Sequence, residues 1–268
     1  MGRILSASVF SLTLSTLFNV QAAPLSPQHF GDFDQYVLAL SWQPGFCQSM
    51  QARSRNLPAE CQHPAERADK SAWLTLHGLW PSLPGSVAAK GVDNGRWMRF
   101  GCSTRPVPNL AEVKPGKKCA APDTGLSHSV AAQLAEQMPG AGGSSCLERY
   151  DYAKHGVCFG FNPDDYFATM VRLNQSVRKS ALGQYLASHY GQTVSRDDVI
   201  HAIAAAWGNE SVNAVKLTCH GNPASLTDVQ IALKASAINQ PLAAGSFAPG
   251  PHPGNCPDTF TLAAAVSR

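Results

Sequence analysis

Two short segments of the sequence carry side chains that could perform acid–base chemistry. The segment LTLHGLWPSLPG places His77 between a hydrophobic run and a proline-rich turn. The segment SSCLERYDYAKHGVC carries Asp151, Lys154 and His155 at the spacing i, i+3 and i+4, which puts them on one face of a helix. Two imidazoles with pKa values near about 6.5 can hold opposite protonation states around neutral pH. The two segments could therefore supply a general acid and a general base.

Each of these groups also has an ordinary structural interpretation. His77 could be a core histidine whose nitrogens are satisfied, and the helix cluster could be a surface salt-bridge face that ends in a histidine. The two histidines are 78 positions apart (155 − 77), and the spacing does not show that they face each other. Trp80 could stack on a flat ligand or belong to the core.

The pattern around these segments predicts one α+β domain. Hydrophobic runs at 33–42 and 72–80 indicate strands, and the second would deliver His77 where the strand ends. After residue 208 the apolar period changes to two, which predicts an antiparallel hairpin that turns at 221–223. Strands early, helices in the middle and strands late are typical of α+β domains. Caps and stops predict the middle helices at 127–140, 162–183 and 195–208.

The short helix that carries the polar cluster should span residues 146–155. Ser145 followed by Glu148 is typical of a capping box, and Gly156 is a natural stop. On the 162–183 helix, the stripe of Phe167, Met170, Val171 and Val177 predicts core packing rather than a cofactor site. Residues 82–126 form a long Pro- and Gly-rich loop that Cys102 and Cys119 could tie down.

The beginning of the chain indicates export. Residues 1–22 combine Arg3, an uncharged apolar run and a small-residue cleavage site after Ala22, as secretory signals do. We therefore expect a mature domain of residues 23–268, in the periplasm of a Gram-negative cell or outside another kind of cell. The apolar run is too short and too polar for a membrane anchor. Without Arg3, the chain has 20 basic and 18 acidic residues. A polyanion must therefore be bound by local groups of side chains rather than attracted by net charge.

The cysteines support the same compartment. All eight lie after the cleavage site, and an even count behind a signal predicts four disulfides. A zinc site is disfavoured because the chain has no CxxC pair and no HxxxH motif. Spacing alone does not choose among the 105 possible pairings of eight cysteines. These residues are Cys47, Cys61, Cys102, Cys119, Cys146, Cys158, Cys219 and Cys256.

The sequence resembles the ribonuclease T2 family along nearly the whole mature chain. HGLW and YDYAKHGVC resemble the two active-site segments of that family, in the right order. FDQYVLALSWQPGFC resembles its first strand and first cysteine, and the likeness continues through GNPASL and HPGNC. The resemblance implies the family fold, a central antiparallel sheet packed by several helices and stapled by disulfides. It also implies an endoribonuclease that acts on single-stranded RNA.

The resemblance assigns roles to the site residues. It implies that His155 is the base, that His77 is the acid, that Lys154 stabilises the phosphorane and that Asp151 orients or polarises the cluster. It implies a 2′,3′-cyclic phosphate as first product, then a 3′-phosphate, with no metal and no other cofactor. Trp80 is expected to stack on a base.

Three positions bear on substrate binding. Tyr150 stands where many family members have a phosphate-binding histidine, so phosphate binding should be weaker there. Asp151 replaces the usual glutamate and shortens its reach by one methylene. Ser82 stands where some purine-preferring fungal relatives have an acidic residue, and its hydroxyl should select bases only weakly. We therefore expect cleavage with little base preference.

The family also implies a disulfide map and a simple set of partners. We expect Cys47–Cys61 and Cys219–Cys256 from the resemblance and local proximity, and assign the remaining cysteines as Cys102–Cys158 and Cys119–Cys146. RNA is the expected partner, with no membrane association and a monomeric state. Two rivals remain: a metal-dependent phosphodiesterase, which would need acidic metal clusters that the sequence does not display, and a catalytically silent or weak RNA- or protein-binding relative.

Overall fold

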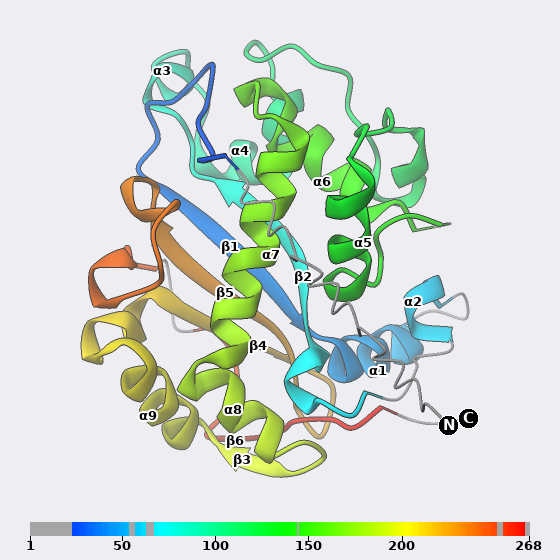
Figure 1. Ribbon diagram of the computed structural model, residues 1–268, viewed down its shortest axis with the longest axis vertical. Coiled ribbons are helices and arrows are strands. Elements are labelled where there is room, and N and C mark those ends of the chain that lie inside the picture. The colour runs from blue at the N-terminus through cyan, green and yellow to red at the C-terminus, as the bar shows by residue number, and fades with distance from the viewer. Residues whose placement is uncertain (1–22, 54–56, 63–66, 144, 251–253, 266–268) are drawn as a thin grey trace, which may run out of the picture.

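The computed structural model of the protein describes residues 23–53, 57–62, 67–143, 145–250 and 254–265. The predicted signal peptide lies outside these residues. The strands form one sheet in the order β2-β1-β5-β6-β3, and β4 also pairs with β5 (Figure 1). All strand pairs are antiparallel except a single parallel pairing of β5 with β6. The strands are β1 Gln35–Trp42, β2 Leu74–Pro81, β3 Thr193–Ser195, β4 Val215–His220, β5 Ser225–Lys234 and β6 Thr259–Thr261.

Helices cover the sheet and confirm the predicted α+β class. The α-helices are α1 Gln43–Arg53, α2 Ala59–Gln62, α3 Gly85–Ala88, α4 Asn94–Phe100, α5 His128–Gln137, α6 Leu147–His155, α7 Pro163–Lys179, α8 Ala181–Ser188 and α9 Arg196–Trp207. Short 3₁₀ helices lie at Lys70–Trp73, Gly101–Ser103, Pro115–Ala120, Val157–Phe159, Asn209–Ala214, Ala235–Ala237 and Ala244–Ser246. No helix among the described residues is long and apolar enough to cross a bilayer.

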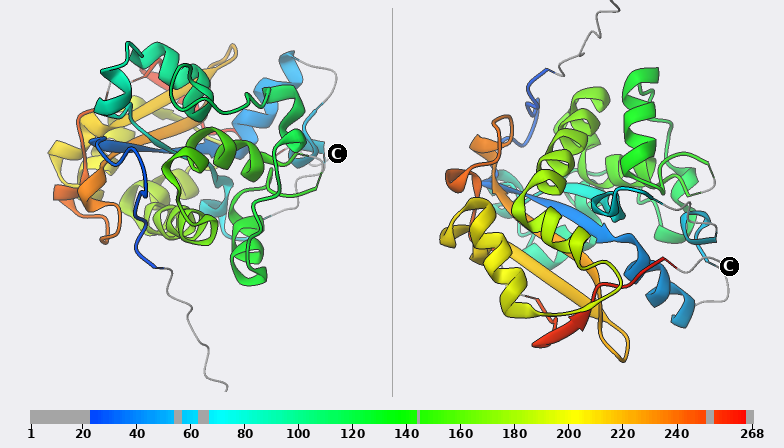
Figure 2. Two further views of the ribbon diagram at one scale, coloured as in Figure 1. Left: turned by 90° about the horizontal axis from the view of Figure 1, so that it is seen from above. Right: turned by 60° about the horizontal axis from the view of Figure 1, so that its bottom comes forward.

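Helix α7 packs on β1 and β2, with α5 beside it (Figures 1 and 2). Phe167, Met170, Val171 and Val177 are buried, as predicted for a core stripe. Caps at Ser127, Asn162 and Ser195 each accept a backbone N–H, which explains where α5, α7 and α9 begin.

One predicted helix boundary is wrong. The 162–183 helix ends at Lys179, and Ser180 caps a separate helix, α8, by accepting the N–H of Gly183. Gly183 therefore lies inside α8 rather than after α7. A Cβ at this position would overlap the carbonyl oxygens of Val177 and Arg178, so the tight junction requires glycine.

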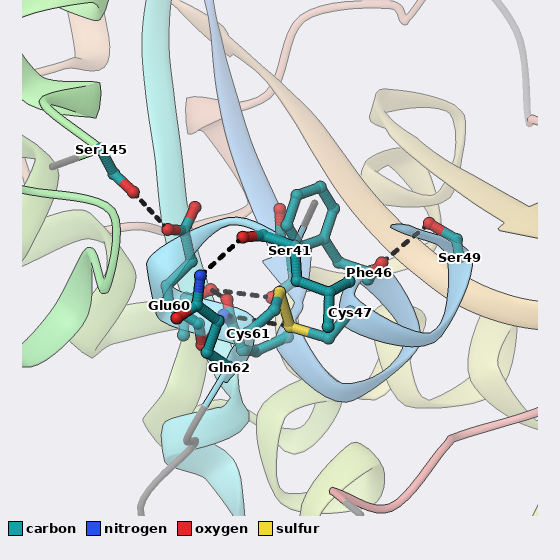
Figure 3. Close-up of a disulfide and its surroundings, with 11 residues drawn as sticks. Ser41, Phe46, Cys47, Ser49, Glu60, Cys61, Gln62 and Ser145 are labelled. Atoms are coloured by element: carbon teal, nitrogen blue, oxygen red, sulfur yellow. Dashed lines mark hydrogen bonds between the residues drawn. A yellow bond between two sulfur atoms is a disulfide. The ribbon is translucent and has the colours of Figure 1, made fainter. Parts of the chain in front are cut away.

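The capping box at Ser145 and Glu148 is also wrong. The residue before α6 is Cys146, which adopts a left-handed conformation and gives no side-chain cap. The Ser145 hydroxyl instead donates to Glu60 (Figure 3). The Glu148 carboxylate accepts the N–H of Gly142. Both side chains bond to other segments, so the start of α6 is set by tertiary contacts.

All four predicted disulfides are confirmed. Cys47–Cys61 joins α1 to α2 (Figure 3), and Cys219–Cys256 fixes the end of β4. The bonds Cys102–Cys158 and Cys119–Cys146 attach the 82–126 segment to the two ends of α6. The long loop is therefore tied down, as expected, and α6 is clamped at both ends.

Candidate active site

A β-bulge presents His77, which corrects its predicted position at the end of a strand. His77 lies inside β2, where Leu40 of β1 pairs with Leu76 and Ala39 pairs with Gly78. His77 is therefore the extra residue that has no partner in β1. Bulges redirect side chains and occur often beside functional sites. The His77 side chain remains 41% exposed, in contrast to the buried residues on either side of it.

Helix α6 packs on β2 and brings the second histidine to the first. Trp80 contacts both imidazoles: its ring centroid is 5.5 Å from that of His77, edge to face, and 5.4 Å from that of His155, stacked. The Trp80 indole N–H donates to Asp151 Oδ1 at 3.0 Å. The two imidazoles, which the sequence left unconnected, thus contact the same indole.

The carboxyl of Asp151 is buried and bonded on both oxygens. Oδ1 accepts from Trp80, and Oδ2 lies 2.9 Å from the hydroxyl of Tyr166. That hydroxyl also donates to the Leu79 carbonyl, and it has one proton to give. Because the hydroxyl proton goes to Leu79, it cannot also go to Oδ2. If Oδ2 carries a proton, it can donate that proton to the Tyr166 oxygen, and both the carboxyl and the hydroxyl are then fully hydrogen-bonded. Burial raises the pKa of Asp151 to about 7, although both hydrogen bonds and Lys154 oppose this shift, so the neutral acid is populated near neutrality.

The histidines and the lysine are shifted toward their uncharged forms. Burial lowers the pKa of His155 well below its usual value, and the charges of Lys154 and His77 act in the same direction. Partial withdrawal from solvent lowers the pKa of His77, with Lys118 and Lys154 adding to the shift and Asp228 opposing it. Burial likewise lowers the pKa of Lys154, against the attraction of Asp151. Because these cations repel one another, a bound anion would stabilise them.

Tyr150 and Lys154 line a pocket of about 230 Å³ together with Arg99 and Glu112. The Lys154 ammonium lies 5.9 Å from the centre of the Tyr150 ring. Burial raises the pKa of the Tyr150 phenol, and the negative charges of Asp151 and Glu112 add to this. Tyr150 therefore presents a neutral hydroxyl beside Lys154 at physiological pH.

Ser82 lies just beyond β2, where its hydroxyl accepts the N–H of Gln35 at 3.3 Å. It does not line the hollow of about 50 Å³ that contains His77. That hollow is lined instead by hydroxyl, amide, carboxylate and ammonium groups, from Ser41, Gln43, Glu60, Thr75 and Lys118.

Sequence reasoning missed Tyr166 and Asp228, which contact the predicted site residues. Tyr166 lies on α7 next to Phe167, in a segment whose pattern predicts core packing. Asp228 lies on β5, in a strand whose apolar and polar residues alternate. Neither stands in a motif, so only the fold reveals them. Among the described residues, no group of three His, Cys, Asp or Glu side chains could hold a metal ion.

Comparison with known proteins gives a consistent result. Residues 33–241 match the Ribonuclease T2 family. The chain is 58% identical over 257 residues to Ribonuclease I of Escherichia coli (strain K12), which covers 96% of each chain.

Solved structures share the fold at low identity. The SF11-RNase of Nicotiana alata superposes with a TM-score of 0.55 at 17% identity, over 87% of this chain and all of that one. The Japanese pear S3-RNase gives 0.51 at 17% identity, over 85% of this chain and 99% of that one. A variant of RNase MC1, solved in complex with 5′-GMP, gives 0.50 at 18% identity over 85% and 99%. The active-site segments, the disulfides and these likenesses agree, and the chain belongs to the ribonuclease T2 family of endoribonucleases.

Proposed function

We propose that this endoribonuclease cleaves single-stranded RNA by metal-independent transesterification at the site formed by β2 and α6. The observation that carries the proposal is the pair of imidazoles that both contact Trp80, with Lys154 next to His155 on α6. The solved relative that holds 5′-GMP supports a nucleotide as the ligand.

In the proposed reaction, His155 removes the proton of the 2′-hydroxyl. The 2′-oxygen then attacks phosphorus, so a P–O2′ bond forms while the P–O5′ bond breaks. His77 gives its proton to the departing 5′-oxygen, and the product is a 2′,3′-cyclic phosphate. Lys154 stabilises the crowded phosphorane electrostatically. Water then opens the cyclic ester slowly to a 3′-phosphate, with the roles of the two histidines reversed.

The role of Asp151 is indirect in this proposal. Its oxygens are bonded to Trp80 and Tyr166, so it orients the indole and, through it, the His155 ring. Trp80 remains the proposed stacking platform for a base, and Tyr150 the proposed hydroxyl donor to a phosphate oxygen. The Tyr150 pocket adds Arg99, a cation suited to a neighbouring phosphate.

Export to the periplasm and a monomeric state are part of the proposal. Cleavage after Ala22 would turn the backbone N–H of Ala23, which donates to Asp165 at 3.1 Å, into a charged amino terminus. That terminus would then form an ion pair at the first turn of α7. Four disulfides and Leu25, which is buried, also support a mature chain that begins near residue 23.

The direct test is the chemistry of the products. Purified protein incubated with RNA in the presence of a chelator should retain full activity and give 2′,3′-cyclic and then 3′-phosphate ends, identified by mass spectrometry. DNA and 2′-O-methyl RNA should resist, because they lack the nucleophile. Inhibition by the chelator, or cleavage of DNA at a similar rate, would favour the metal-dependent rival. A folded protein with no activity on RNA would favour the silent relative.

A second prediction concerns base preference. Rates on the four homopolymers, measured with their own structure melted out, should be comparable because stacking on Trp80 tolerates every base. The mixed donors and acceptors around His77 also discriminate weakly. Ser82→Asp should shift preference toward adenine. A hundredfold preference of the native enzyme for one base would contradict the prediction.

A further inference from the structure

The carboxylate of Asp228 approaches the His77 ring across the sheet. The register places Asp228 of β5 opposite Ser41 of β1, and Ser41 opposite Thr75 of β2. These three residues form a row, and His77 lies two positions after Thr75. Asp228 Oδ1 is 3.9 Å from Nδ1 of His77.

Two bulges produce this approach. His77 is the extra residue of β2 against β1, and Thr227 is the extra residue of β5 against β4. The Thr227 hydroxyl lies 2.7 Å from Asp228 Oδ2 and 3.1 Å from the Thr218 carbonyl oxygen, and the Ser41 hydroxyl donates to Oδ1 at 3.5 Å. The Thr227 hydroxyl shares its single proton between these two acceptors, so the carboxylate has one full and one shared neutral donor, and Oδ1 can accept a second hydrogen bond.

Among the charged groups that act on His77, Asp228 has the opposite sign to the two lysines. Lys118 and Lys154 are positive and disfavour the imidazolium of His77, and the His155 ring contacts the same indole as His77. Asp228 is negative and favours the imidazolium. Both oxygens of Asp151 are hydrogen-bonded to Trp80 and Tyr166, so Asp151 is not the carboxylate that pairs with the His77 imidazolium.

We infer that Asp228 is a positioning residue that holds His77 through its Nδ1–H and leaves the Nε2–H for the departing 5′-oxygen. The inference rests on the proposed role of His77 as general acid. A separation of 3.9 Å is longer than a hydrogen bond, but catalytic contacts of free enzymes shorten when substrate binds. A carboxylate orients an imidazole in the same way in hydrolase triads.

The test compares two substrates that differ in their leaving group. On a diribonucleotide, Asp228→Asn should move the alkaline limb of kcat/KM down by about one pH unit, which is about a tenfold loss above that limb. On uridine 3′-(4-nitrophenyl phosphate) the variant should stay within about twofold of wild type, because nitrophenolate leaves without a proton. His77→Ala should show the same dependence on substrate. The control Asp258→Asn removes an exposed carboxylate that pairs with Arg196 and should change neither rate.

The outcomes separate the two proposals. An unshifted pH profile, or an equal loss on both substrates, would overturn the role of Asp228. An equal loss on both substrates by His77→Ala would instead overturn the role of His77 as the acid. Should Asp228→Asn fail to fold, Thr227→Val removes the hydroxyl that orients the carboxylate and should shift the alkaline limb in the same direction by less. No shift in that variant would count against the inference.

Discussion

Alanine at His77 or at His155 should each lower kcat on RNA by at least about 10²–10⁴-fold, the loss typical of general acid–base groups. Nδ1 of His155 has no hydrogen-bond partner among the described residues, and Nδ1 of His77 is 3.9 Å from Asp228 Oδ1, so both variants should remain folded. The double variant should lose far less than the product of the two single losses, because the two groups act in one step. Single-turnover rates on a short single-stranded RNA, measured for the two single variants and the double variant, test this expectation.

The pH dependence assigns the two roles. The base must be neutral, and burial with two nearby cations lowers the pKa of His155, so the acid limb should lie well below pH 6.5. The acid must be protonated, so the alkaline limb should report His77. His77→Ala should therefore abolish the alkaline limb and keep the acid limb, whereas His155→Ala should do the reverse.

A matched control is His201→Ala on α9, an exposed histidine far along the chain from both segments. It should retain wild-type rates and the complete bell-shaped profile. A His77/His155 double variant near wild-type activity, or a profile that keeps both limbs after either substitution, would contradict the assignment.

The elements that carry the site could be predicted because their signals are local. An i, i+3, i+4 spacing fixes which side chains share a helix face, whatever the helix packs against. The glycine stop after His155 is likewise read from a few neighbours, and so are the caps at Ser127 and Asn162. The disulfide map followed from the family resemblance rather than from the spacing of the cysteines.

The missed features depend on pairing between distant strands. A bulge is a property of two strands together, so the sequence of β2 alone gave His77 a place at a strand end. Asp228 is 151 positions from His77 (228 − 77), and only the register of β5 on β1 brings it near. The capping box failed for a similar reason, since Ser145 and Glu148 find their partners in other segments.

Gly78 lies where β2 packs closely on α6, and the substitution Gly78→Ala should lower both stability and activity. A Cβ at Gly78 would overlap both Asp151 Oδ1 and Trp80 Nε1, the two atoms that form the hydrogen bond between the strand and the helix. The Asp151 carboxyl is buried and cannot swing away as a surface side chain would, and Trp80 is half-buried and tied to it by the indole hydrogen bond. The methyl must therefore push α6 from β2 or break the bond.

We expect Gly78→Ala to lower the free energy of unfolding by about 1–3 kcal/mol, as overpacking of a close-packed core does. The rate should fall further than stability explains, by about 10²-fold for a displacement near 1 Å, because Trp80 positions both imidazoles. Thermal unfolding and kcat measured on the same preparation, well below the melting temperature, separate the two effects. Gly245→Ala is the control, since a Cβ there meets nothing within 4 Å and both quantities should stay at wild type. If Gly78→Ala kept wild-type kcat while losing stability, the contact of β2 with α6 would hold the fold together without setting the geometry of the histidines.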